Sequence, residues 1–363
     1  MTTTAAGPVA PGRRRPLRRL RPLVPVLLVA AVAGYLLPQF ADVRQVWGAV
    51  RGMTWLEGTS LAAAAALNLA SYGALMVCTM PGLTFRQAMV VTEATTAVAN
   101  TLPGGSAVAV GLSAAMYTSW GFSPARSTVS LLVSGLWNNV AKLGLPVLAL
   151  ALLALRGDVT RARLVAALLG VAGLLAVVAA LWAVLRSESS ARWVGRASAA
   201  VADRLLGLLG RPPVHGWDRA TTKFRSRTVL LLHARWHVLT AVTLGSHLAL
   251  FLVLLLALRH VGVSEREVAW TQALAVFSFA RLLTAVPVTP GGVGVVEVAL
   301  VAGLAAAGGP DAQVVAAVLV FRALTYVLPI PLGLLAQLYW RRNTSWRRPP
   351  GAAPRTRLVP EAA

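Results

Sequence analysis

The sequence contains a single cysteine, Cys78, among 363 residues, and it lies inside an apolar run. An intrachain disulfide is therefore excluded, and neither a cysteine-rich metal site nor redox chemistry is expected. The sequence also lacks a Walker A loop and a kinase-type Gly-rich loop, and the segment GGVGVVE at 291–297 lacks the third glycine of a dinucleotide site. We therefore expect no metal, no cofactor and no use of ATP by this chain alone.

Acidic residues are scarce as well, because 12 Asp and Glu stand against 34 Lys and Arg, which gives a formal net charge of +22. The basic residues do not form one soluble patch, so nucleic acid is not an expected partner. They gather in three segments, 1–21, 187–236 and 343–363. Since Lys and Arg accumulate on the cytoplasmic side of membrane proteins, we expect all three segments in the cytoplasm.

Hydrophobic residues, in contrast, make up 57% of the chain and charged residues only 13%. Several nearly uncharged runs are long enough to cross a membrane as helices, and no stretch alternates as a barrel strand does. The predicted fold is therefore an all-α, polytopic transmembrane helical bundle. The predicted helices span 22–38, 54–79, 125–155, 163–185, 237–258 and 312–340.

Two further apolar regions, 87–120 and 267–308, are interrupted near their centres by Pro-Gly-Gly. Proline removes a backbone donor and glycine adds flexibility, so each region is predicted to be a broken helical hairpin, either re-entrant or fully spanning. The breaks are Pro103, Gly104, Gly105 and Pro290, Gly291, Gly292. Each is followed at a similar distance by a glycine and a proline, Gly121 with Pro124 and Gly308 with Pro310. The order helix, broken hairpin, helix thus occurs twice, and an odd number of crossings between the units predicts two inverted repeats.

This topology divides the chain into a basic cytoplasmic tail at 1–21, a transmembrane domain at 22–342 and a disordered cytoplasmic tail at 343–363. Within the domain, 187–236 is predicted to be a basic amphipathic cytoplasmic segment. Its apolar stripe indicates a helix lying on the inner leaflet, and a solvated linker helix is the alternative.

Five charged residues fall within predicted membrane segments, where a charge is costly and therefore a candidate for function: Glu93, Lys142, Arg281, Glu297 and Arg322. Arg281 and Glu297 flank the second break at similar depths, so they are expected to pair or to hold a zwitterionic headgroup together. A purely structural ion pair is the alternative. Arg322 would then leave one cation free for a phosphate, whereas Lys142 is also consistent with a side chain that snorkels to an interface.

Asn100, next to the first break, is expected to line the same cavity or to bond a neighbouring helix. The predicted substrate-binding residues are those at the breaks and the charges around them: Glu93, Asn100, Pro103, Gly104, Gly105, Arg281, Pro290, Gly291, Gly292, Glu297 and Arg322.

Residues 282–335 resemble the lysylphosphatidylglycerol synthase transmembrane region, also called the flippase-like domain family. The likeness rests on the second Pro-Gly-Gly, Glu297, the pair Phe321-Arg322, and Pro329 with Gly333, and a looser likeness extends over 20–342. In multiple peptide resistance factors this region is associated with moving aminoacylated phosphatidylglycerol to the outer leaflet, and a separate C-terminal domain makes the lipid. The resemblance implies a multi-pass protein of the bacterial plasma membrane with both termini cytoplasmic, and a flippase-like module without the aminoacyltransferase domain.

The implied partners are membrane lipids, in particular anionic phospholipid, and a separately encoded lipid-modifying transferase. Three functions remain open. The first, which we favour, is a translocator that is not an enzyme. The second is a transferase acting on lipid-linked substrates with Glu93 or Glu297 as base. The third is an accessory subunit that recruits a transferase.

Overall fold

The computed structural model describes residues 48, 51–102, 104–157, 161–187, 189–190, 193, 196–197, 199–200, 203, 217–284, 290–349 and 351–352. The predicted helix at 22–38, the tail at 1–21, Pro103 and most of the predicted interfacial helix lie outside the described residues. The described part is helical and contains no sheet strand, which confirms the all-α prediction. Four of its helical segments are long and apolar enough to cross a membrane: Trp55–Thr79, Pro124–Leu155, Thr228–His260 and Asp311–Arg342.

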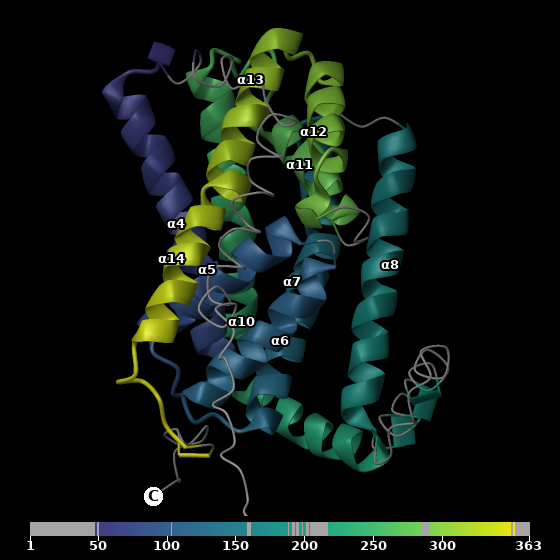
Figure 1. Cartoon of the computed structure of the whole chain (residues 1–363). Coiled ribbons are helices and arrows are strands. Elements are labelled where there is room, and N and C mark those ends of the chain that lie inside the picture. The colour runs from purple at the N-terminus through teal and green to yellow at the C-terminus, as the bar shows by residue number, and fades with distance from the viewer. Residues whose placement is uncertain are drawn as a thin grey trace, which may run out of the picture.

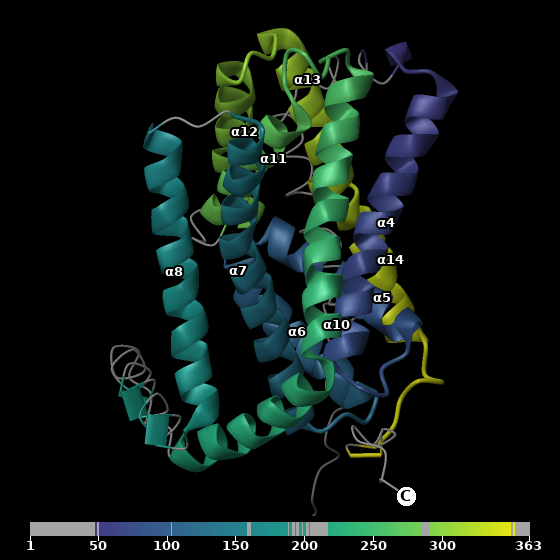
Figure 2. The ribbon, with the colours of Figure 1, turned by 180° about the vertical axis from the view of Figure 1, so that it is seen from behind.

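The long helices run along a common axis and form an elongated bundle (Figures 1 and 2). They are α4 (Trp55–Thr79), α7 (Pro124–Leu155), α8 (Arg161–Arg186), α10 (Trp217–His260) and the continuous segment Asp311–Arg342, which contains α13 (Asp311–Arg322) and α14 (Pro329–Arg342). Local sequence sets where several begin. Thr54 and Glu57 form a capping box before α4, and Pro124 occupies the first turn of α7, where its missing N–H costs nothing.

Both predicted breaks are present. The first region forms α5 (Phe85–Thr101) and α6 (Gly105–Ser119), and the second forms α11 (Trp270–Leu283), the 3-10 turn η1 (Pro290–Gly292) and α12 (Val295–Ala306). The helices have 17, 15, 14 and 12 residues, fewer than the roughly 20 that a bilayer crossing requires. Helices of these lengths favour re-entrant hairpins over full crossings, and each hairpin returns to the end of the bundle from which it starts.

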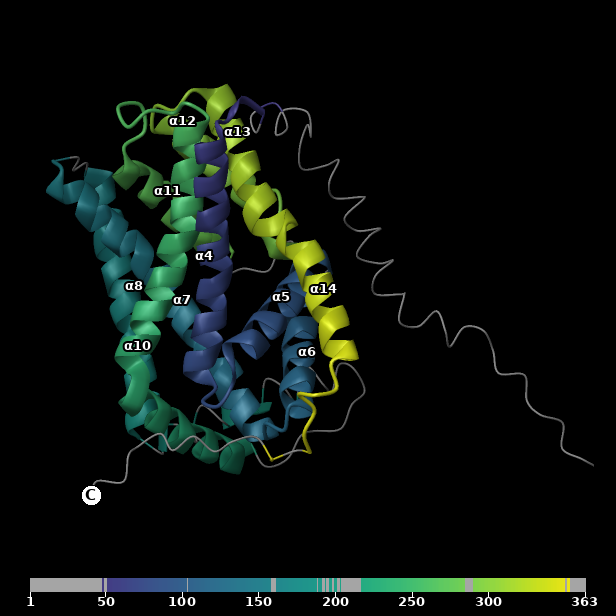
Figure 3. The same cartoon turned by 90° about the vertical axis from the view of Figure 1, so that its left-hand side faces the viewer.

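The two hairpins approach the middle of the bundle from opposite ends (Figures 1 and 3). We call the end with Thr79 and Arg342 the lower end, and the end with Trp55 and His260 the upper end. The α5–α6 hairpin belongs to the lower end and the α11–α12 hairpin to the upper end. This arrangement agrees with the predicted order of crossings, whereas the internal symmetry of two inverted repeats stays a prediction.

Two predicted helix boundaries differ from the structure. Helix α10 begins at Trp217, well before the predicted start at 237, because nothing between 217 and 236 is proline or glycine and no residue there breaks the helix. Its first part lies across the lower end before the chain turns into the bundle (Figure 1). The part of the predicted cytoplasmic segment from 217 to 236 is thus continuous with a spanning helix.

The predicted helix at 312–340 is not uniform, because a π-helical turn, η2 (Ala323–Val327), separates α13 from α14. Leu328 donates its N–H to the carbonyl of Ala323 (2.9 Å), five residues back. Pro329 has no N–H to donate to the preceding turn, so the widened turn lies where the regular bonding is already interrupted.

The start of the predicted disordered tail is ordered. Residues 343–349 and 351–352 fold back along the lower end, where Trp346 meets the Trp120 ring edge-on with centroids 5.9 Å apart. The N–H of Arg348 donates to Ser119 (3.0 Å) and that of Gly351 to Gly121 (2.8 Å). The prediction of disorder over 343–363 is therefore wrong for these residues, because buried aromatic contacts and backbone bonds order them. Residues beyond 352 lie outside the described part.

Candidate functional site

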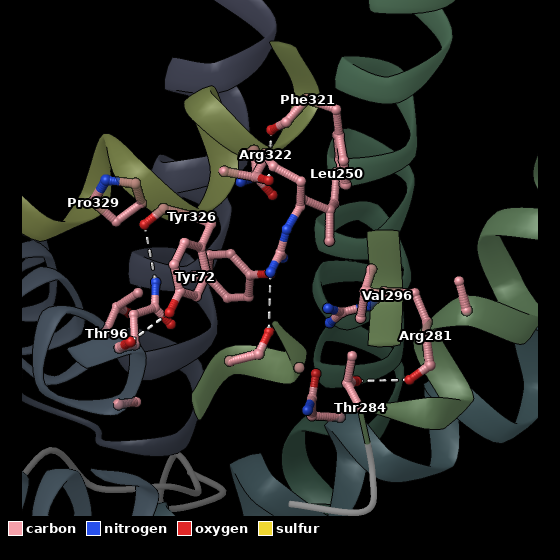
Figure 4. Close-up of a pocket in the computed structure, with 18 of the residues that line it drawn as sticks. Tyr72, Thr96, Leu250, Arg281, Thr284, Val296, Phe321, Arg322, Tyr326 and Pro329 are labelled. Carbon is pink, nitrogen blue, oxygen red and sulfur yellow. Dashed lines mark hydrogen bonds between the residues drawn. The ribbon is translucent and has the colours of Figure 1, made fainter. Parts of the chain in front are cut away.

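A cavity of about 380 Å³ lies at the centre of the bundle, where the two hairpins meet. Its wall combines residues of α4, α5, α6, α7, α10, α11, η1, α12, α13, η2 and α14, and Figure 4 labels ten of them. Four charged side chains line it: Glu93, Lys142, Arg281 and Arg322. A polar cavity of this size within an apolar bundle is the most marked departure from a simple packed core.

Arg322 is held by a buried ion pair. Its Nε donates to Oε1 of Glu297 at 2.6 Å, and the two side chains are only 11% and 14% exposed. Its Nη2 also reaches the carbonyl of Gly291 (3.4 Å), and the guanidinium lies 4.5 Å from the centroid of the Tyr326 ring. Glu297 is in the first turn of α12, where the helix dipole favours a negative charge. This pair fixes the second break to α13.

The predicted contact between Arg281 and Glu297 is absent from the described structure, since Arg322 is the partner of Glu297. The prediction used depth alone. Depth along a hairpin does not determine the face of a helix on which a side chain lies, and Arg281 lies with Phe277, Ala280 and Thr284 on the cavity face of α11. In Figure 4, Arg322 lies between Tyr326 on one side and Arg281 on the other.

Tyr326 joins the two breaks. Its hydroxyl donates to the carbonyl of Asn100 (2.5 Å), and Asn100 Nδ2 donates to the carbonyl of Tyr326 (3.2 Å). Asn100 is in the last turn of α5, where carbonyls have no partner within the helix. Gly291 has φ +59° and lies against the same ring, and a Cβ there would be 2.2 Å from Tyr326 Cε2. Only glycine satisfies both the backbone angle and this close approach.

Gly333 on α14 allows the first hairpin to pack close to the cavity. A Cβ on Gly333 would lie 2.2 Å from the Glu93 carbonyl oxygen and 2.4 Å from the Ala97 Cβ, so α14 and α5 pack backbone to backbone. This close packing puts Glu93 in the cavity wall. The Glu93 side chain is 7% exposed, and its Oε2 has no hydrogen-bond partner in the described structure.

Lys142 and Arg281 form a second group of cavity charges. Lys142 on α7 is 9% exposed, and Arg281 Nε is buried without a hydrogen-bond partner. Neither cation pairs with a carboxylate in the part of the chain that the structure describes. Both side chains line the same cavity.

Residues 23–333 match the family model described as the lysylphosphatidylglycerol synthase TM region. The chain belongs to this family. It is an integral membrane protein whose matched region includes both broken hairpins and every cavity charge. None of the curated proteins matches the chain closely enough to count as a relative.

In this lysylphosphatidylglycerol synthase TM region, most of the predicted site residues lie together. Glu93, Asn100, Arg281, Gly291, Gly292 and Arg322 all line the cavity, and Glu297 lies directly behind Arg322. Gly104 and Gly105 do not line it. Gly104 (φ +66°) makes the turn, and Gly105 packs where a Cβ would be 2.4 Å from the Val98 carbonyl oxygen. Pro290 opens η1, its side chain lies outside the described part, and Pro103 is not described.

Lys142 is the cavity residue that sequence reasoning undervalued. The sequence contains two signals for this. Lys142 is far from both ends of the 32-residue helix α7, too deep for easy snorkelling, and it follows the cavity residue Asn138 by one helical turn.

Among the described residues, no group of three or more His, Cys, Asp and Glu side chains could hold a metal ion.

Proposed function

We propose that this member of the lysylphosphatidylglycerol synthase TM region family translocates a lipid with a polar headgroup between the two leaflets. The lipid is aminoacyl-phosphatidylglycerol or a related anionic or polyprenyl-linked lipid. The observation that carries the proposal is the charged cavity between two hairpins that enter from opposite ends of the bundle. Such a cavity gives a headgroup polar partners at a depth where the bilayer offers none.

The cavity volume of about 380 Å³ suits the headgroup of a lipid rather than the whole molecule. In the proposed cycle the headgroup passes the breaks while the acyl chains stay in the surrounding bilayer. Helix ends at Asn100 and Gly291 contribute backbone carbonyls, and Arg322, neutralised by Glu297, supports this wall without adding net charge.

The proposal does not include chemistry on the lipid. Glu297 is engaged by Arg322 and is unsuited as a general base, while Glu93 has no ion-pair partner or second acid beside it in the described structure. We further propose the bacterial plasma membrane as the location, with the lower end cytoplasmic. A separately encoded transferase would supply the lipid.

The test is translocation in liposomes. The full chain, reconstituted in vesicles with fluorescent phosphatidylglycerol, is expected to speed the exchange of label between leaflets above the rate of protein-free vesicles. Aminoacylated and polyprenyl-linked lipids form parallel arms. If none of these lipids moves faster than in empty vesicles, the proposal is wrong.

A matched pair of variants on α6 distinguishes blocking of the cavity from a general effect of a tryptophan on the translocation rate. Ser106 lines the cavity and is itself exposed, whereas Val108 is exposed and does not line it. Ser106→Trp is expected to bring the rate close to that of empty vesicles, and Val108→Trp to leave it unchanged. Equal rates for the two variants would exclude a route through this cavity.

A further inference from the structure

Two cations of the cavity wall, the buried Lys142 and the partly buried Arg281, have no carboxylate partner in the described part of the chain, which a structural role does not explain. Lys142 and Arg281 come from different helices, α7 and α11, and both side chains reach the cavity. In the described structure neither forms an ion pair, and Arg281 Nε lacks even a hydrogen bond. Glu93 lines the same cavity, but among the described residues no ion pair joins it to either cation, and Leu250, Phe277 and Leu300 are apolar.

This arrangement is unfavourable while the cavity is empty. Each charge loses its hydration and gains no partner, and the two repel each other. Arg281 is also repelled by Arg322. The contrast with Arg322 is informative, because Arg322 in the same cavity does have a carboxylate at 2.6 Å. Among the described residues, one of the three cavity cations is thus paired with a carboxylate, and Lys142 and Arg281 are not.

We propose that Lys142 and Arg281 form a phosphate-binding subsite that holds the phosphate group of the transported lipid. The inference rests on the proposed function and specifies its substrate class as lipids with a phosphate ester in the headgroup. Two cations that line one cavity match the charge of a phosphate, the guanidinium can donate to two of its oxygens at once, and the ammonium supplies a second, compact charge. Asn138 and Tyr72, which line the cavity, add donors of the right type.

The first test is the stability of the empty protein. A cation that stabilises the fold would lower the apparent melting temperature when replaced, whereas an uncompensated one would not. Lys142→Met and Arg281→Met are therefore expected to melt, in neutral detergent, at the same temperature as the unmodified chain or higher. Arg322→Met, which leaves Glu297 unpaired, is expected to melt lower. A clear drop for Lys142→Met would assign it a structural role and overturn the proposal.

The second test is binding of dodecyl phosphate, a single-chain phosphate ester, followed by the same melting temperature. It is expected to stabilise the unmodified chain, and its affinity is expected to fall about tenfold to a hundredfold in Lys142→Met or Arg281→Met, as for loss of a charge-assisted bond. Arg86→Gln, an exposed change at the start of α5, is the charge-matched control and is expected to bind normally. Equal affinity in all four proteins would contradict the subsite.

Two further probes identify the source of the phosphate. Inorganic phosphate that stabilises as well as dodecyl phosphate would support the subsite for free phosphate and argue against a lipid. Dodecyltrimethylammonium carries a positive charge in place of the phosphate. If it binds as strongly as dodecyl phosphate, the proposal is overturned. The translocation assay gives an independent outcome. Lost phosphate binding in Lys142→Met with no translocation by the unmodified chain would leave the subsite standing and reject the transport proposal. If Lys142→Met translocates lipid as fast as the unmodified chain, the transport proposal stands and the subsite is rejected.

Discussion

At the scale of single residues, the three cations of the cavity differ in whether they have a partner within the protein. Arg322 is bound by Glu297, the Gly291 carbonyl and the Tyr326 ring, so it holds the second break in place. Lys142 and Arg281 have no carboxylate partner in the described structure, and we propose that they bind the phosphate of a ligand. Breaking a buried pair leaves one charge without compensation, while removing both charges together costs much less.

This asymmetry predicts a measurable cycle of variants. Arg322→Met is expected to destabilise the chain by about 3 to 5 kcal/mol, because Glu297 remains buried and unpaired. Adding Glu297→Gln is expected to recover most of that loss. Unfolding in a mixed-detergent titration measures both. If the double variant is as unstable as the single one, the pair does not act as a unit and the packing of the arginine stem is the main term.

At the scale of elements, glycine allows the hairpins to meet the helices that complete the cavity. Gly333 lets α14 pack on the backbone of α5, and Gly291 lets η1 pack on Tyr326. A side chain at either position would separate elements whose residues form the site. The regular helices, in contrast, tolerate glycine without requiring it, as at Gly135 in α7, where a Cβ would meet nothing within 4 Å.

The contrast between these glycines gives a matched experiment. Gly333→Ala is expected to destabilise the chain by about 1 to 3 kcal/mol, because its Cβ cannot fit beside the Glu93 carbonyl without moving α14. Gly135→Ala is expected to be neutral or to stabilise by about 0.5 to 1 kcal/mol, as usual within a helix. Melting temperatures compare the two. A harmless Gly333→Ala would show that α14 shifts freely and does not position the cavity wall.

At the scale of the whole molecule, the two hairpins enter from opposite ends, and the orientation in the membrane decides which leaflet each one serves. The basic segments predict that the lower end is cytoplasmic. The ordered residues after Arg342 belong to that end, and the loop between α10 and α11 belongs to the upper one (Figure 3).

Thiol labelling in whole cells checks the orientation, because Cys78 is the only cysteine and Cys78→Ser gives a clean background. Arg266 and Ser345 are exposed at the upper and lower ends. A membrane-impermeant maleimide is expected to label Arg266→Cys in intact cells and Ser345→Cys only after permeabilisation. The opposite pattern would invert the predicted topology and with it the leaflet assigned to each hairpin.

The sequence by itself determined the class of fold, the family and the positions of the breaks. Long apolar runs, Pro-Gly-Gly and Pro329 act through local backbone chemistry, which is the same in any tertiary context. It also singled out the four charged residues that line the cavity, since a charge inside an apolar run is rare whatever surrounds it.

Only the tertiary structure decided which charges meet. Arg281 and Glu297 are close in sequence and similar in depth, yet Arg322 takes the glutamate because the rotation of each helix about its axis is set by packing at contacts such as Gly333 on α5. The same packing places Lys142, a candidate charge for which the sequence left snorkelling open, in the wall of the cavity that Arg281 also lines. Depth in the membrane is a property of a segment, whereas pairing is a property of the whole arrangement of helices.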